Sequence, residues 1–98
     1  MYKLVNAVAR FSRHYKDFVL AQPAYEFAMQ VADNTASAFE EETLDVKLVR
    51  LTAAKRALAE CMYCVWLADE EGYETLKVII AAELVRIHLE LYIRTLTR

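Results

Sequence analysis

Few side chains of this 98-residue chain are of types that carry out acid–base, nucleophilic or metal chemistry. The only imidazoles are those of His14 and His88, and neither has a glutamate three residues earlier, so the Glu-x-x-His pattern of di-iron helical bundles is absent. A glycine-rich phosphate loop is excluded as well, because Gly72 is the only glycine. We therefore expect a protein that is not an enzyme and that uses no cofactor.

Two further groups consist of residue types that bind metals or take part in redox chemistry, but their sequence context fits neither role. Cys61 and Cys64 have the C-x-x-C spacing, yet a redox pair of this kind begins a helix and a structural zinc needs four ligands. This pair lies inside an apolar run with no second pair, which predicts two thiols packed in a core. The run Glu40 to Glu42 lacks the spaced oxygen ligands and the glycine of a calcium loop, so we expect a solvated turn there and no metal.

The element that positions these residues is the long segment from Leu44 to Ala68. Its apolar residues recur at alternating spacings of three and four, which keeps them on one face of an α-helix. This row consists of Leu44, Leu48, Leu51, Ala54, Leu58, Cys61, Val65 and Ala68. A second row beside it widens the apolar surface, so the helix needs neighbours on two sides.

The rest of the chain predicts three more helices around this one, in a single domain 1–98. We expect helices at about 2–21, 23–40, 44–71 and 74–96. Pro23 suits the first residue of a helix, the side chain of Thr43 suits an N-cap, and Gly72 suits the left-handed residue after a helix end. The weak helix formers Asp33, Asn34 and Ser37 leave two readings of the second helix open, a buried hydrogen-bonded contact or local strain. The fold class is therefore all-α, a four-helix bundle.

Two helices carry more apolar surface than one bundle core can cover. Besides 44–71, the segment 74–96 has a row from Leu76 to Leu91 and a second row from Val78 to Leu96. Surplus apolar rows of this kind indicate contact with another subunit. We therefore predict self-association, with these interface residues: Trp66, Val78, Val85, Leu89 and Tyr92.

Charge gives a weaker indication of partners. The net charge is −2, which does not suit a general nucleic-acid coat, but residues 1–20 hold Lys3, Arg10, Arg13 and Lys16 against Asp17 alone. This outer face has three readings, namely a solvated surface, a phosphate-contacting surface or a protein contact. The aromatic residues Tyr63, Trp66 and Tyr73 likewise either stack on bases or close a bundle end or subunit contact.

The start of the chain lacks the pattern of a secretory signal, and no stretch has 18 uncharged apolar residues. We therefore expect no membrane span and a cytoplasmic location.

Several short motifs resemble, in their order and spacing, those of a known family. Residues 34–39 read Asn-Thr-Ala-Ser-Ala-Phe, residues 54–60 end in Leu-Ala-Glu, and Gly72-Tyr73 follows Ala68. The pattern resembles Asn-Ile-Ala-Glu-Gly-Phe, Ala-x-x-Ser-Leu-Ala-Glu and Gly-Tyr in the four-helix-bundle family that contains the accessory variability determinants of diversity-generating retroelements and the proteins encoded in ribosomal RNA intervening sequences. Ser37, Ala38 and Ala57 depart from it.

The resemblance implies an antiparallel up-down four-helix bundle assembled into a homo-oligomeric ring, commonly a pentamer. It further implies binding to a reverse transcriptase and, through phosphate contacts, to RNA or DNA during mutagenic reverse transcription. That branch is typically basic, whereas this chain is not. The alternative is a self-assembling interaction module of the intervening-sequence type with no nucleic-acid role. The candidate nucleic-acid-binding residues are Arg10, Arg13, Lys16, Lys47, Arg50, Lys55 and Arg56.

Overall fold

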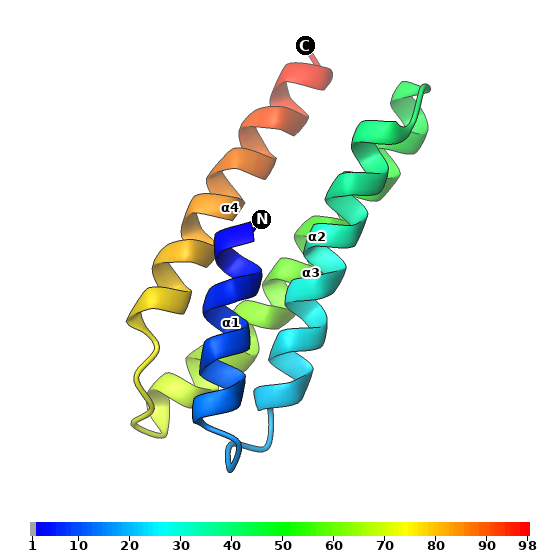
Figure 1. The fold of residues 1–98 in the computed structure, drawn as a ribbon. Coiled ribbons are helices and arrows are strands. Elements are labelled where there is room, and N and C mark those ends of the chain that lie inside the picture. The colour runs from blue at the N-terminus through cyan, green and yellow to red at the C-terminus, as the bar shows by residue number, and fades with distance from the viewer. Residues whose placement is uncertain (1) are drawn as a thin grey trace.

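The computed structural model describes residues 2–98, and all its regular structure is helical (Figure 1). The helices are α1 (Tyr2–His14), α2 (Ala21–Glu40), α3 (Leu44–Glu70) and α4 (Leu76–Leu96). No strand occurs within residues 2–98. The all-α class and the four helices predicted from the periodicity are confirmed.

The first helix is shorter than its apolar pattern predicts. α1 ends at His14, and residues 15–20 form consecutive turns in which the amide of Phe18 donates to the carbonyl of Tyr15 at 3.1 Å. These turns bring the ring of Phe18 into the interior, where it is 3% exposed. Phe18 and Tyr15 therefore keep the apolar period of a helix although they belong to a folded turn.

The second helix begins before its proline rather than at it. α2 starts at Ala21, so Pro23 is the third residue, where the missing amide is one that the helix leaves free. Farther along, the hydroxyl of the buried Thr35 donates to the carbonyl of Val31 at 2.7 Å, and the amide of Asn34 donates to Gln30 at 2.9 Å. Asn34 and Thr35 are thus accommodated by hydrogen bonds within the helix itself.

The third helix is closed by the only glycine. Gly72 has φ +92°, the left-handed conformation predicted for it. Its amide donates to the carbonyl of Asp69 at 3.0 Å, and the amide of Tyr73 donates to Ala68 at 3.0 Å, which satisfies two carbonyls of the last turn. At the other end, Thr43 occupies the N-cap position with an extended backbone, but its side chain makes no capping hydrogen bond.

The four helices pack around one core, with each helix beside two others. α2 packs along α3, α1 bridges α2 and α4, and α4 closes against α3. The interior is filled by leucine, valine and alanine, with Leu4, Leu51 and Val65 among the largest fully buried side chains. No helix within residues 2–98 has a stretch long and apolar enough to cross a membrane.

The helices differ in length, and this shapes the two ends of the molecule. α1 spans about 20 Å and α3 about 40 Å, at 1.5 Å per residue. Figure 1 shows the start of α1 level with the middle of α4, so that α2, α3 and α4 continue beyond it. There the rings of Phe39 and Tyr92 meet edge to face with their centroids 5.1 Å apart. The result is an elongated body of 42 × 18 × 17 Å.

Candidate functional site

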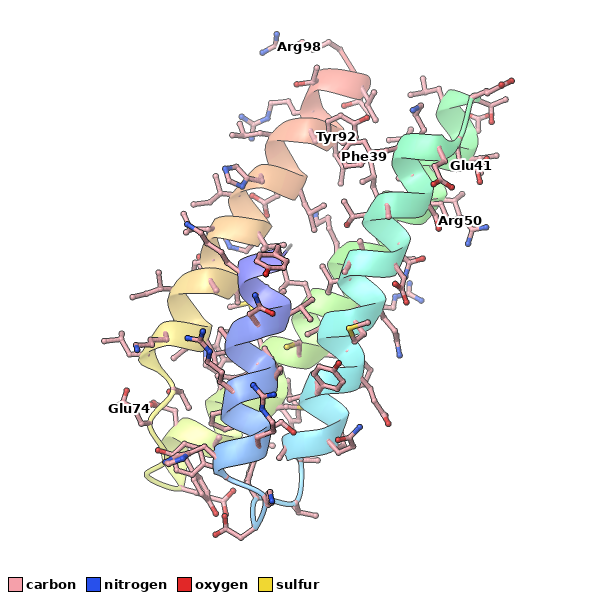
Figure 2. The ribbon with its side chains drawn as sticks, viewed as in Figure 1. Phe39, Glu41, Arg50, Glu74, Tyr92 and Arg98 are labelled. Carbon is pink, nitrogen blue, oxygen red and sulfur yellow. The ribbon has the colours of Figure 1, made fainter. Side chains whose placement is uncertain are left out.

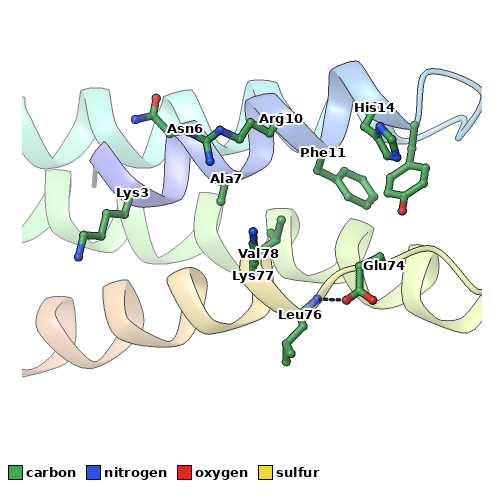
Figure 3. Close-up of a pocket in the computed structure, with 11 residues that line it drawn as sticks. Lys3, Asn6, Ala7, Arg10, Phe11, His14, Glu74, Leu76, Lys77 and Val78 are labelled. Carbon is green, nitrogen blue, oxygen red and sulfur yellow. Dashed lines mark hydrogen bonds between the residues drawn. The ribbon is translucent and has the colours of Figure 1, made fainter.

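A groove of about 700 Å³ runs between α1 and the start of α4 (Figure 3). Its floor is apolar, formed by Ala7, Phe11 and Val78, and Leu76 lies at its edge. Polar and charged side chains from both helices surround this floor. They are Lys3, Asn6, Arg10, His14, Tyr15, Glu74 and Lys77.

The cations of this groove have no acidic partner. Within residues 2–98, Arg86 is the only cation in an ion pair, at 2.8 Å from Glu83 and 3.2 Å from Glu90. Lys3 and Arg10 are therefore exposed positive charges without a salt bridge, and so is Lys77. These unpaired charges make the groove suited to an anionic group.

The acid of the groove has a structural role at the helix start. Oε1 of Glu74 accepts a hydrogen bond from the amide of Leu76 at 3.2 Å, which satisfies one of the free amides at the beginning of α4 (Figure 3). Three cations and one carboxylate leave the groove with a net positive charge.

The other two predicted cations of the first segment lie outside the groove. Arg13 is in the last turn of α1 and Lys16 is in the following turn, and both are exposed. Nearby Asp17 accepts a hydrogen bond from the hydroxyl of Tyr73 at 3.1 Å. The cationic surface of the N-terminal segment thus extends from the groove across the end of α1.

The four predicted cations of α3 do not form a second patch. Lys55 lines a groove between α3 and α4, Arg56 lies in a shallow hollow on α3 with Leu48 and Thr52, and Nζ of Lys47 donates to the carbonyl of Ala38 at 3.4 Å. Arg50 points away from the bundle in Figure 2. Because α1 and α3 are not neighbours, the structure does not bring the two predicted clusters together.

Three of the five predicted interface residues require a correction. Val78, Val85 and Leu89 are 3%, 5% and 2% exposed, so they pack in the core of their own chain and are closed to a second subunit. Their row faces the other helices because α1 and α3 cover that side of α4. Trp66 is 53% exposed, and Tyr92 is half-buried against Phe39.

The other apolar row of α4 is the one on the surface. Its side chains are 43 to 60% exposed, and they follow one another along more than four turns of the helix. The row consists of Leu76, Ile80, Leu84, Ile87 and Leu91. An unbroken apolar row of this length is unusual for a protein surface that faces only water.

One edge of this row carries a fixed charge cluster. The guanidinium of Arg86 donates to Glu83 and to both carboxylate oxygens of Glu90, and these hydrogen bonds and charges raise the pKa of Arg86. The neighbouring groove is lined by the apolar side chains of Met62 and Trp66. With Lys55 this groove has two cations and two carboxylates, in contrast to the net positive groove beside α1.

The cysteine pair is part of the core. Cys61 and Cys64 are free, buried thiols, and burial followed by the neighbouring Cys64 raises the pKa of Cys61 to about 12. Burial also raises the pKa of Cys64. Both therefore stay protonated at neutral pH and are poor nucleophiles and metal ligands. The described part of the chain has no cluster of three or more metal-ligating side chains.

The three aromatic residues named from the sequence lie in different surroundings. Tyr73 closes one end of the bundle, with its ring 4.9 Å from Tyr15 and 5.2 Å from Phe18. Tyr63 and Trp66 are more than half exposed on α3.

Lys77 was not predicted as a site residue, because it is an isolated cation in the sequence and only its place opposite α1 brings it to the groove.

Comparison with models of protein families, with curated proteins and with solved structures finds no match for this chain.

Proposed function

We propose that this protein is a non-enzymatic, self-associating adaptor that holds nucleic acid through phosphate contacts, of the accessory variability determinant kind. The observation that carries the proposal is the set of unpaired cations on and beside α1. Phosphate contacts supply most of the affinity of proteins that bind nucleic acid without reading bases. The small net charge of the whole chain does not oppose this, because five of its twelve cations lie on or beside α1, namely Lys3, Arg10, Arg13, Lys16 and Lys77.

The partner and the assembly in this proposal come from the family resemblance. A reverse transcriptase is the proposed protein partner, and template RNA or DNA the proposed ligand. An antiparallel bundle repeated in a ring, commonly of five subunits, is the proposed assembly. The exposed row of α4 supports self-association, because it leaves an apolar surface for another subunit to cover.

The nucleic-acid part is tested with the double variant Arg13→Gln and Lys16→Gln, since both side chains are exposed and outside the groove. We expect weaker binding to a single-stranded RNA, measured by fluorescence anisotropy from about 50 to 200 mM salt. Loss of two phosphate contacts lowers the slope of log affinity against log salt by about 1.4.

The matched control is Arg50→Gln with Arg56→Gln, which removes the same charge from α3, away from α1. The control should bind almost as tightly as the wild type. If the wild type binds no RNA at 50 mM salt, or if both double variants lose the same affinity, the nucleic-acid proposal is wrong.

A second function is favoured by a different observation. The exposed row of α4 also suits a self-assembling interaction module without nucleic acid, as in the intervening-sequence proteins. This alternative predicts an oligomer whose mass, measured by light scattering, does not change when RNA is added.

A further inference from the structure

One end of the molecule carries an acidic and apolar turn that the proposed function does not use. This acidic turn, residues 39–46, joins α2 to α3 and contains four carboxylates and no cation. Exposed apolar side chains accompany these acids, with Phe39 at 59% and Leu44 at 46% exposure. Lys47 follows at once, but its ammonium group is turned back to the carbonyl of Ala38.

The groove between α1 and α4 has the complementary character. Its three unpaired cations surround an apolar floor, and Leu76 belongs both to its edge and to the exposed row of α4. The groove and the row therefore form one continuous surface, cationic on one side and apolar on the other. An acidic segment with exposed apolar side chains is the partner that such a surface fits.

Within one molecule the two surfaces cannot meet. Figure 2 shows Glu41 near one end of the long axis and Glu74 toward the other. The molecule is 42 Å long, and α2 and α3 hold the acidic turn away from the start of α4. Any contact between the turn and the groove must therefore involve two copies of the chain.

We propose that the acidic turn of one copy docks in the groove of the next copy. The carboxylates of Glu40 and Glu42 lie against the cations of α1 and Lys77, and Leu44 and Val46 cover the beginning of the exposed row. This inference rests on the proposed self-association, for which it supplies the mode of contact. It uses the cations of the groove and leaves Arg13 and Lys16, the residues changed in the nucleic-acid test, free for phosphate contacts.

The geometry of such a contact determines the kind of assembly. Because the two surfaces differ, each copy uses its turn on one neighbour and its groove on another. Repetition produces a closed ring if the rotation between copies closes, and an open filament if it does not. A symmetric two-fold dimer through the exposed row alone is a different arrangement.

Charge reversal tests the contact. The groove variant is Arg10→Glu with Lys77→Glu, and the turn variant is Glu40→Lys with Glu42→Lys; all four side chains are exposed, so folding should be retained. We expect each variant to associate at least about tenfold more weakly than the wild type, measured by sedimentation at low salt, because like charges then face each other. Combining all four changes in one chain should restore association, since opposite charges meet again.

Matched controls carry the same charge changes elsewhere. They are Arg13→Glu with Lys16→Glu, and Glu70→Lys with Glu71→Lys, all outside the two surfaces. The inference is overturned if the turn variant associates like the wild type, or if the combined variant does not recover. In those cases self-association itself stands, whereas a wild type that stays a monomer at every concentration refutes both.

Discussion

The hydroxyl of Tyr73 donates a hydrogen bond to Oδ2 of Asp17 at 3.1 Å and thereby joins the two turns at one end of the bundle. Asp17 lies between α1 and α2, and Tyr73 lies between α3 and α4. The ring of Tyr73 also packs against Phe18, which is almost fully buried. The end of the bundle is thus fixed by a polar contact outside and an aromatic contact inside.

We predict that the aromatic contact contributes more than the polar one. Phe18→Ala should lower the free energy of unfolding by about 3 kcal/mol, because it leaves a cavity in the core. Tyr73→Phe keeps the ring and removes only an exposed hydrogen bond, so its effect should be much smaller. Urea unfolding of both variants measures the difference, and an equal loss would contradict this order.

The contact of Tyr73 should also respond to alkali. Partial desolvation, then the hydrogen bond to Asp17 and the charges of Asp17 and Glu71, raise the pKa of Tyr73. A raised pKa means that this contribution to stability is complete below the pKa of an unfolded tyrosine, about 10, and is lost as the pH rises above it. Ultraviolet titration should show one late-ionising tyrosine that is missing in Tyr73→Phe.

We predict a moderate cost for Gly72→Ala. The residue has φ +92°, which an alanine adopts with strain, but no atom lies within 4 Å of the position of an added Cβ. The free energy of unfolding should therefore fall by about 1 kcal/mol, from the strained backbone conformation alone. Gly72→Asn is the control, since asparagine tolerates this conformation better and should lose less stability in the same unfolding experiment.

The buried thiol predicts a pH dependence above neutrality. The pKa of Cys61 is about 12 in the folded protein against a reference of 9.0, so unfolding releases a proton at alkaline pH. The contribution of the Cys61 thiol to the free energy of unfolding is complete below pH 9 and falls as the pH rises toward 12. Between pH 8 and pH 10 the wild type should lose about 1 kcal/mol more than Cys61→Ala. Equal slopes would show that Cys61 is not protected.

We predict that changes in the exposed row of α4 lower the mass of the protein in solution. Ile80→Lys with Ile87→Lys should keep the helical fold and shift the protein to a monomer of 11.3 kDa, measured by light scattering. Gln22→Lys with Gln30→Lys is the matched control, because these exposed residues lie on α2, away from the row. An oligomer that survives both pairs of changes would show that the row is not an interface.

Periodicity was sufficient to predict the helical fold but not the end of the first helix. Tyr15 and Phe18 continue the apolar spacing of α1, yet both belong to turns. Their side chains point inward because they pack with Tyr73, which is more than 50 residues away in the chain. A local apolar pattern indicates that a side chain is buried, but it does not indicate whether the backbone at that residue is helical.

The same limit explains the two rows of α4. Ile80 and Val85 are equally apolar, and the sequence shows both rows without telling which one is covered. Which row of α4 is covered depends on the positions of α1 and α3, and these positions depend on contacts along the whole bundle. Likewise, Lys77 and Arg10 belong to one groove only after α1 and α4 have packed.

The shortness of α1 has a consequence for how the molecule opens. At the level of α1 the core is enclosed by four helices, whereas the far ends of α2, α3 and α4 lack that cover. Amide protons near Leu51 and Val65 should therefore exchange with solvent only on global unfolding, and those around Leu44 by local fraying. The free energy of local opening therefore decreases along the bundle, from the part enclosed by four helices to the far ends of α2, α3 and α4.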